Sequence, residues 1–105
     1  MSHHFSLRTL EPVTIYVDDP LWPAHNRMWA HLVSDYSLDE LHSFAGSNGI
    51  PSRAFDLDHY DVPADRIEDL VAAGAIHVSP HELVTRLIAS GLRVTAKQRR
   101  AQSDD

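Results

Sequence analysis

Residues 75–91 read AIHVSPHELVTRLIASG and place a short strand directly before a capped helix. Ala75 to Val78 alternates as a strand does. Ser79 and Glu82 form a capping box, and Pro80 suits the first turn of the helix, which Gly91 ends. The helix carries one apolar stripe, made of Leu83, Val84, Leu87 and Ile88. A strand followed at once by a helix is typical of α/β folds.

The N-terminal half contains the other clear strand signals. Residues 13–17 read VTIYV, a β-branched and aromatic run that Asp18-Asp19-Pro20 ends. Pro20 to Asn26 holds two prolines and Trp22, so we expect a loop that buries the ring. Residues 28–34 fit either a strand or a helix, and their alternation favours a strand.

A helix is predicted next. Ser37 and Glu40 form a capping box, and Gly49 can close the helix in the left-handed conformation. Its apolar face consists of Leu38, Leu41, Phe44 and Ala45.

The middle of the chain predicts a strand and one more helix. Residues 53–55 are expected as a short strand that leads into the polar segment 56–61. Pro63 suits the first turn of a helix that Gly74 ends. The residues expected to face inward from this helix are Ile67, Leu70 and Val71.

Together these elements predict one small α/β domain over residues 13–94, with a sheet that is at least partly parallel and three helices packed on it. A chain of 105 residues is too short for two independent cores. Residues 1–12 are expected to form an N-terminal arm, and residues 95–105 a disordered polar tail.

The composition excludes several classes of protein. The chain has no cysteine, so disulfides and thiolate zinc sites are excluded. Its apolar runs fall far short of the roughly 20 residues that cross a bilayer, and the start shows no signal peptide, so we expect a cytoplasmic protein without membrane contact. The net charge of −6 disfavours nucleic acid. A homodimer or another protein is the remaining kind of macromolecular partner.

Five motifs stand in order along the chain: YVDDP at 16–20, WAHLVSD at 29–35, ELHSFA at 40–45, HYDVP at 59–63 and AAGA at 72–75. Together they resemble a family of bacterial and phage proteins catalogued as domain of unknown function 4031, over about residues 13–92. The resemblance implies no particular activity, substrate or cofactor. It directs attention to the polar positions of the motifs, which are Asp18, Asp19, His31, Asp35, His59 and Asp61.

Carboxylates and histidines form the strongest candidate site. Ligands of open α/β sheets bind at the carboxyl ends of strands, where Asp18 and Asp19 are expected. Carboxylate oxygens and imidazole nitrogens are ligands of magnesium, manganese, zinc and iron. The candidate metal ligands are Asp18, Asp19, His31, His59 and Asp61, from a wider set that includes Asp56 and Asp58. Alternatively, His31 or His59 could act as a general base.

The same residues also have structural interpretations. Asp18 and Asp19 can cap backbone amides in a turn, and Asp61 can cap the helix predicted to follow it. His31 lies among apolar neighbours and fits a buried histidine whose nitrogens are hydrogen-bonded. His42 is expected to face solvent. The aromatic residues Trp22, Trp29, Phe55 and Tyr60 could form a stacking platform for a base or sugar, or anchor the core and a loop.

Two functions remain open, and the residues do not decide whether the protein is an enzyme. The preferred interpretation is a non-catalytic binding or interaction module, which predicts scattered acids that each pair with an amide or an arginine. The alternative is a metal-dependent hydrolase of a phosphoester or nucleotide. It predicts that the candidate ligands converge around a cleft.

Overall fold

A mixed sheet of six strands runs through the computed structural model, which describes residues 14–95 and 97–98. The strand order is β4-β5-β3-β1-β6, and β2 pairs with β3. The strands are β1 (Ile15–Val17), β2 (Trp22–Ala24), β3 (Arg27–Ser34), β4 (Phe55–Asp56), β5 (His59–Pro63) and β6 (Ile76–His77). The helices are α2 (Leu38–Ser47), α3 (Ile67–Ala72) and α4 (Pro80–Ser90), with short 3₁₀ helices η1 (Ser52–Ala54) and η2 (Ala64–Arg66).

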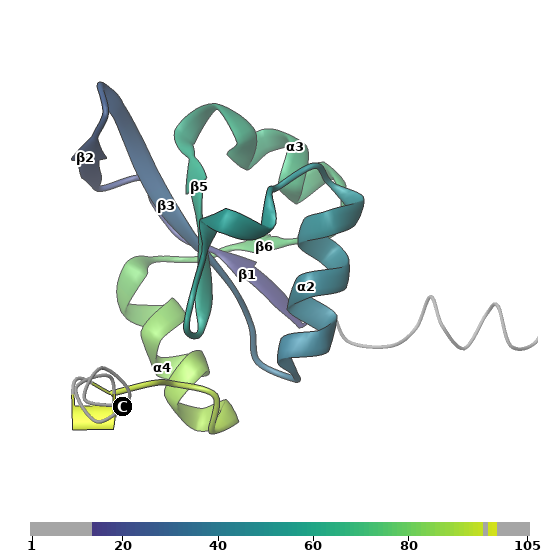
Figure 1. Ribbon diagram of the computed structural model, residues 1–105, viewed down its shortest axis with the longest axis vertical. Helices are drawn as coiled ribbons and strands as arrows, with labels where there is room; N and C mark the ends of the chain where they lie inside the picture. The colour runs from purple at the N-terminus through teal and green to yellow at the C-terminus, as the bar shows by residue number, and fades with distance from the viewer. Residues whose placement is uncertain (1–13, 96, 99–105) are drawn as a thin grey trace, which may run out of the picture.

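The helices cover both faces of this sheet. Helices α2 and α3 lie on one side and α4 on the other, so the domain has three layers (Figure 1). Strands β1 and β6 are parallel, whereas the other strand pairs are antiparallel. The predicted α/β class, with a partly parallel sheet and three helices, is confirmed. None of the helices in the described residues has the length and apolarity needed to span a membrane.

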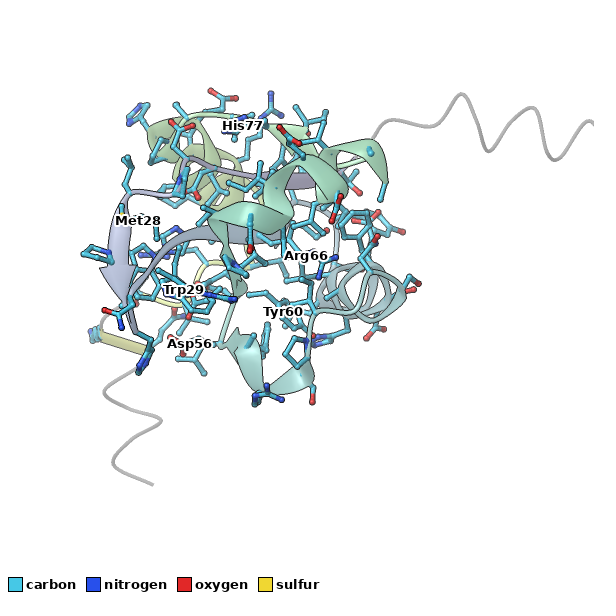
Figure 2. The ribbon with its side chains drawn as sticks, turned by 90° about the horizontal axis from the view of Figure 1, so that it is seen from above. Met28, Trp29, Asp56, Tyr60, Arg66 and His77 are labelled. Carbon is cyan, nitrogen blue, oxygen red and sulfur yellow. The ribbon has the colours of Figure 1, made fainter. Side chains whose placement is uncertain are left out.

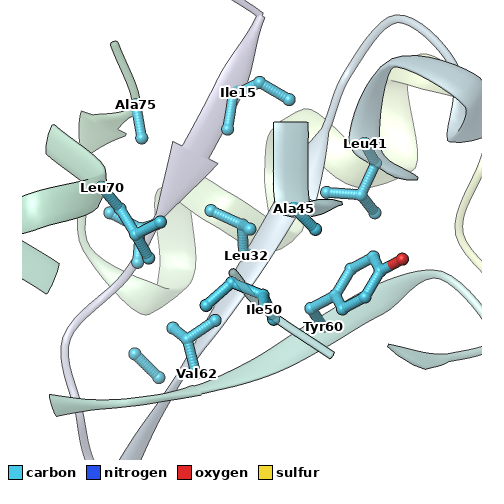
Figure 3. Close-up of a cluster of buried hydrophobic side chains, with 11 residues drawn as sticks. Ile15, Leu32, Leu41, Ala45, Ile50, Tyr60, Val62, Leu70 and Ala75 are labelled. Carbon is cyan, nitrogen blue, oxygen red and sulfur yellow. The ribbon is translucent and has the colours of Figure 1, made fainter. Parts of the chain in front are cut away.

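Alternation along β1 supplies side chains to both layers. Ile15 and Val17 enter the larger cluster, under α2 and α3, while Tyr16 enters the smaller one, under α4. Figure 3 shows the larger cluster, which contains Ile15, Val17, Ala30, Leu32, Leu41, Ala45, Ile50, Tyr60, Val62, Leu70 and Ala75. The smaller cluster contains Tyr16, Val33, Leu83 and Leu87. It covers only part of its face of the sheet, and polar side chains occupy the rest.

The predicted helix caps form, with one difference. Ser37 Oγ accepts the Glu40 N–H at 3.0 Å, and Ser79 Oγ accepts the Glu82 N–H at 3.1 Å. The Glu40 side chain does not complete its capping box. It instead accepts hydrogen bonds from Ser34 and Thr14, and thereby ties α2 to β3 and to the residue that precedes β1.

One segment predicted as a loop contains a strand. The expected loop at residues 20–26 contains β2, joined to β3 by a two-residue turn in which His25 and Asn26 have φ of 52° and 64°. Positive φ at both positions is the pattern of tight hairpin turns. The polar segment 56–61, for which no element was predicted, contains the turn of the β4–β5 hairpin and the first half of β5.

Other local predictions also need correction. Residues 53–55 are mostly the 3₁₀ helix η1, and Pro63 ends β5 rather than opening a helix, since η2 intervenes before α3. Val71, predicted to face inward, is 41% exposed, and Val84 and Ile88 of the predicted apolar stripe are 38% and 59% exposed. The predicted arm at 1–12 lies outside the described residues, as do Val13 and most of the predicted tail, namely residues 96 and 99–105.

Candidate metal centre

The pairing of β3 with β5 gathers two histidines and one aspartate on the face that α4 leaves partly uncovered. In this register His31 lies directly opposite Asp61, and His59 projects from β5 on the same side, two residues before Asp61. One possible ligand atom from each residue lies within 4.8 Å of the other two. The His31 and His59 rings meet edge to face, with 5.0 Å between their centroids. Three predicted ligands are therefore neighbours.

Asp18 fixes the orientation of His31. Its Oδ1 accepts the backbone N–H of His31 at 2.7 Å, and its Oδ2 lies 3.0 Å from His31 Nδ1. Asp18 is 2% exposed, so these bonds are shielded from water. Because Nδ1 faces Asp18, Nε2 is the nitrogen of His31 that remains for a ligand. A histidine that offers one nitrogen to a metal and the other to a carboxylate is the usual arrangement in metal sites.

Asp58 does the same for His59 from the β4–β5 turn. Its Oδ1 lies 2.7 Å from His59 Nδ1, and its Oδ2 accepts the backbone N–H of Val94 at 2.7 Å. Arg93 lies 3.6 Å from Oδ2, and Asp58 is fully buried. The aspartate thus connects the histidine to the segment that follows α4.

The third group, Asp61, has a buried oxygen whose ion-pair partner is His59. Asp61 Oδ1 is buried and lacks a hydrogen bond of acceptable geometry in the described structure, although His59 Nε2 lies 3.2 Å away. A neutral His59 that donates from Nδ1 to Asp58 directs the lone pair of Nε2 toward this oxygen. Two acceptors in this position repel each other unless a proton or a cation lies between them. Ligand atoms of a tetrahedral zinc ion with bonds of 2.0–2.1 Å lie about 3.3 Å apart, close to the separation seen here.

The electrostatics of the centre favour a cation. Burial alone would raise the pKa of Asp58, but hydrogen bonds from His59 and the Val94 amide, with the charge of Arg93, lower the pKa below its ordinary value. The hydrogen bond to Asp18 raises the pKa of His31 against the opposing effect of burial. A metal ion at Nε2 would displace a proton held there. The centre therefore holds two imidazoles among the carboxylates of Asp18, Asp58 and Asp61.

The other candidate residues do not belong to this group of ligand atoms. Asp19 Oδ1 is 2.7 Å from His77 Nε2, at the ends of the parallel strands β1 and β6. Asp56 lies directly opposite His59 in the β4–β5 pairing, but it is exposed on the edge strand, and Figure 2 shows it far from His77. Asp35 Oδ2 is 3.9 Å from Arg86.

One structural interpretation from the sequence is wrong, because Asp61 lies within β5 and caps no helix. His42 is exposed, as predicted. Its Nδ1 also lies 2.7 Å from the Tyr60 hydroxyl, and its ring packs edge-on against Phe55.

Two hollows border the candidate metal ligands His31, His59 and Asp61, which are called the metal-ligand cluster below. A cleft of about 630 Å³ reaches Asp61 between the β2–β3 hairpin and the segment around η1 and η2. A smaller hollow of about 260 Å³ is lined by His31, His59 and residues of α4. Both solvent and a ligand can therefore approach the cluster.

The orienting role of Asp58 was not predicted, although the residue belonged to the wider acidic set. Its position depends on the β4–β5 turn, where Leu57 has a φ of 63°. The sequence signal was the alternation of His59, Tyr60, Asp61 and Val62, which is typical of a strand with one polar face. That pattern would have placed the side chains of His59 and Asp61 on the same face of a strand.

Comparison with known proteins identifies a family but no characterised relative. Residues 15–90 match the family model described as "Protein of unknown function (DUF4031)". Neither the curated proteins nor the solved structures contain a match to this chain. The family match includes β1 to α4, and with them His31, His59, Asp61 and both orienting aspartates. The chain therefore belongs to the DUF4031 family of proteins of unknown function.

Proposed function

We propose that this domain is a metal-dependent hydrolase of small phosphoesters, with the metal held by His31, His59 and Asp61. One observation carries the proposal: two imidazoles, each held at Nδ1 by a buried carboxylate, converge on a third carboxylate that has a buried oxygen without a hydrogen bond. Asp18 then acts as a positioning residue rather than a ligand.

The donor set narrows the choice of metal. Two nitrogens and one oxygen suit zinc, manganese or iron better than magnesium, which prefers an all-oxygen shell with several waters. Three protein ligands leave at least one position for water, as in catalytic zinc sites. We take zinc as the first candidate because the 3.2 Å separation of His59 Nε2 and Asp61 Oδ1 fits a tetrahedral ion.

A bound zinc ion would lower the pKa of its water and supply hydroxide near neutral pH. In hydrolysis the water oxygen forms a new bond to phosphorus, the ester P–O bond breaks, and the departing alcohol takes a proton. The residues of this chain hold the ion and fix both imidazoles through Asp18 and Asp58. The net charge of −6 supports a small phosphoester rather than a nucleic-acid strand as substrate. A chain without cysteine suits the cytoplasm, where we expect this activity.

An interaction module remains the second candidate. Its support is the outer side of α4, where Val84 and Ile88 are 38% and 59% exposed and could contact a second copy of the chain. The convergence of His31, His59 and Asp61 favours the hydrolase, because that hypothesis expected the ligands to meet beside a cleft. Sedimentation of the purified chain would detect a dimer directly.

Hydrolysis of model phosphoesters tests the proposal. Chelator-treated protein, supplied with zinc or manganese, is expected to release nitrophenolate from p-nitrophenyl phosphate or its bis ester. His59→Ala and Asp61→Asn should each lower the rate at least 100-fold. Asp19→Asn, which changes an acid outside the cluster, should keep it. No metal-dependent hydrolysis of either ester, or equal rates in all variants, would refute the hydrolase.

A further inference from the structure

The cleft beside Asp61 contains recognition groups that metal binding does not use. Its lining includes the two tryptophans of the chain, Trp22 and Trp29, and three arginines, Arg27, Arg53 and Arg66. Its volume of about 630 Å³ lies in the range of small-molecule sites. These features indicate which class of substrate the centre accepts.

The tryptophans form an aromatic wall on the β2–β3 hairpin. Their rings stack with centroids 6.1 Å apart and 26° between the planes, and Trp22 lies equally far from the His31 ring. Trp29 Nε1 donates to the Ala24 carbonyl at 2.9 Å, whereas Trp22 Nε1 is buried without a hydrogen-bond partner in the described structure. Indole faces bind flat rings of any base by stacking. A ring bound against this wall would lie close to the metal ligands.

The arginines give the cleft a positive balance within an acidic protein. Arg27 and Arg53 are exposed and form no ion pair with another described residue. Arg66 donates to the Asn48 carbonyl at 2.6 Å and lies 3.4 Å from Asp69. The acids of the lining are Asp61 and Asp65, and a metal ion would neutralise the first. One guanidinium group can donate two parallel hydrogen bonds to the oxygens of a phosphate.

We infer that the cleft binds a nucleoside monophosphate or a close analogue, with its ring against Trp22 and its phosphate directed to the arginines and Asp61. This inference rests on the proposed function, because Asp61 borders the cleft and also belongs to the metal-ligand cluster. The aromatic wall accounts for the ring. Arg27 and Arg53, which form no ion pair with another residue of the described part of the chain, account for the anion. A phosphate without a ring would leave the indole faces unused.

Intrinsic fluorescence tests the inference, because both tryptophans of the chain line the cleft. AMP, adenosine and inorganic phosphate are titrated separately into the full-length protein, with zinc and after chelator treatment. We expect AMP to bind at least tenfold more tightly than adenosine or phosphate. Arg53→Gln should weaken AMP binding at least tenfold and leave adenosine unchanged. Lys97→Gln removes the same charge from a residue that does not line the cleft, and should bind AMP as the wild type does.

The outcomes separate this inference from the proposed function. Equal affinity for AMP and adenosine, or AMP affinity unchanged in both Arg53→Gln and Arg27→Gln, would overturn the nucleotide site. Zinc binding is measured independently by calorimetry on the same samples. Zinc binding without AMP binding would overturn this inference alone. AMP binding without zinc binding would support the cleft assignment and refute the hydrolase.

Discussion

The substitution Asp18→Asn tests whether a buried carboxylate orients a metal ligand. Asparagine has nearly the same shape, and its carbonyl can still accept the backbone N–H of His31, which Asp18 Oδ1 accepts at 2.7 Å. The amide nitrogen then replaces Oδ2, which lies 3.0 Å from His31 Nδ1. Because that nitrogen is a donor, His31 must accept at Nδ1 and, when neutral, carry its proton at Nε2. A protonated Nε2 cannot bind a metal.

The expected loss follows from this change of tautomer. Removal of an orienting partner typically lowers metal affinity about 10- to 100-fold. This range corresponds to about 1.4–2.7 kcal/mol of binding free energy. We expect the upper half of the range, because Asp18 is 2% exposed and water cannot easily replace its carboxylate.

Calorimetric titration of zinc into chelator-treated protein measures the effect. Asp19→Asn is the matched control: it makes the same chemical change one residue away, where the carboxylate contacts His77 instead. Circular dichroism checks that both variants fold. Wild-type zinc affinity in Asp18→Asn, or an equal loss in Asp19→Asn, would refute the orienting role.

Two further predictions concern stability. Leu32→Ala, at a fully buried core position, should lower the free energy of unfolding by about 3 kcal/mol in urea titrations. Met28→Ala on the same strand, where the residue is 41% exposed, should change that free energy by less than about 0.5 kcal/mol. Similar losses at both positions would contradict the assigned core. Burial raises the pKa of Tyr16 and Tyr60, so the folded chain holds these two protons more tightly than the unfolded chain. The contribution of these two tyrosines to stability should therefore be constant below pH about 10 and be lost as the pH rises further. Tyr16→Phe or Tyr60→Phe should reduce the loss of unfolding free energy above this pH. Tyr36→Phe, at an exposed position, should leave that loss unchanged.

The helices could be predicted because their signals are local. The Ser37 and Ser79 caps, and the glycines that follow each helix, act within a few residues. The outer faces were less predictable. Val84 and Ile88 continue the stripe of Leu83 and Leu87, but they lie outside the buried cluster that contains those two leucines and remain exposed.

The short strands were missed because their partners stabilise them. Strand β2 has three residues, one of them Pro23, and forms through its pairing with β3. Strand β5 begins with three polar or aromatic residues, and only Tyr60 and Val62 enter the core. The alternation in β5 is a local strand signal, whereas the prolines around β2 point to a loop.

The candidate site could not be assembled from the sequence, because the register of the β3–β5 pairing was not predicted. Residue chemistry identified His31, His59 and Asp61 as candidate ligands, but only the β3–β5 pairing places Asp61 opposite His31. The same residue types occur in Asp19 and His77, which pair elsewhere. Composition and spacing therefore indicate the type of site, and the sheet decides which members belong to it.

Zinc stoichiometry tests the central claim most directly. Calorimetry on the full-length, chelator-treated protein should show one zinc ion bound per chain at micromolar or lower dissociation constant. Saturation at 100 times that constant should stabilise the fold by about 2.7 kcal/mol, visible as a higher Tm. His59→Ala retains every other histidine of the chain, so it separates this centre from adventitious binding, and it should lose both the heat and the Tm shift. No zinc binding by the wild-type chain, or binding that persists unchanged in His59→Ala, would contradict the metal centre.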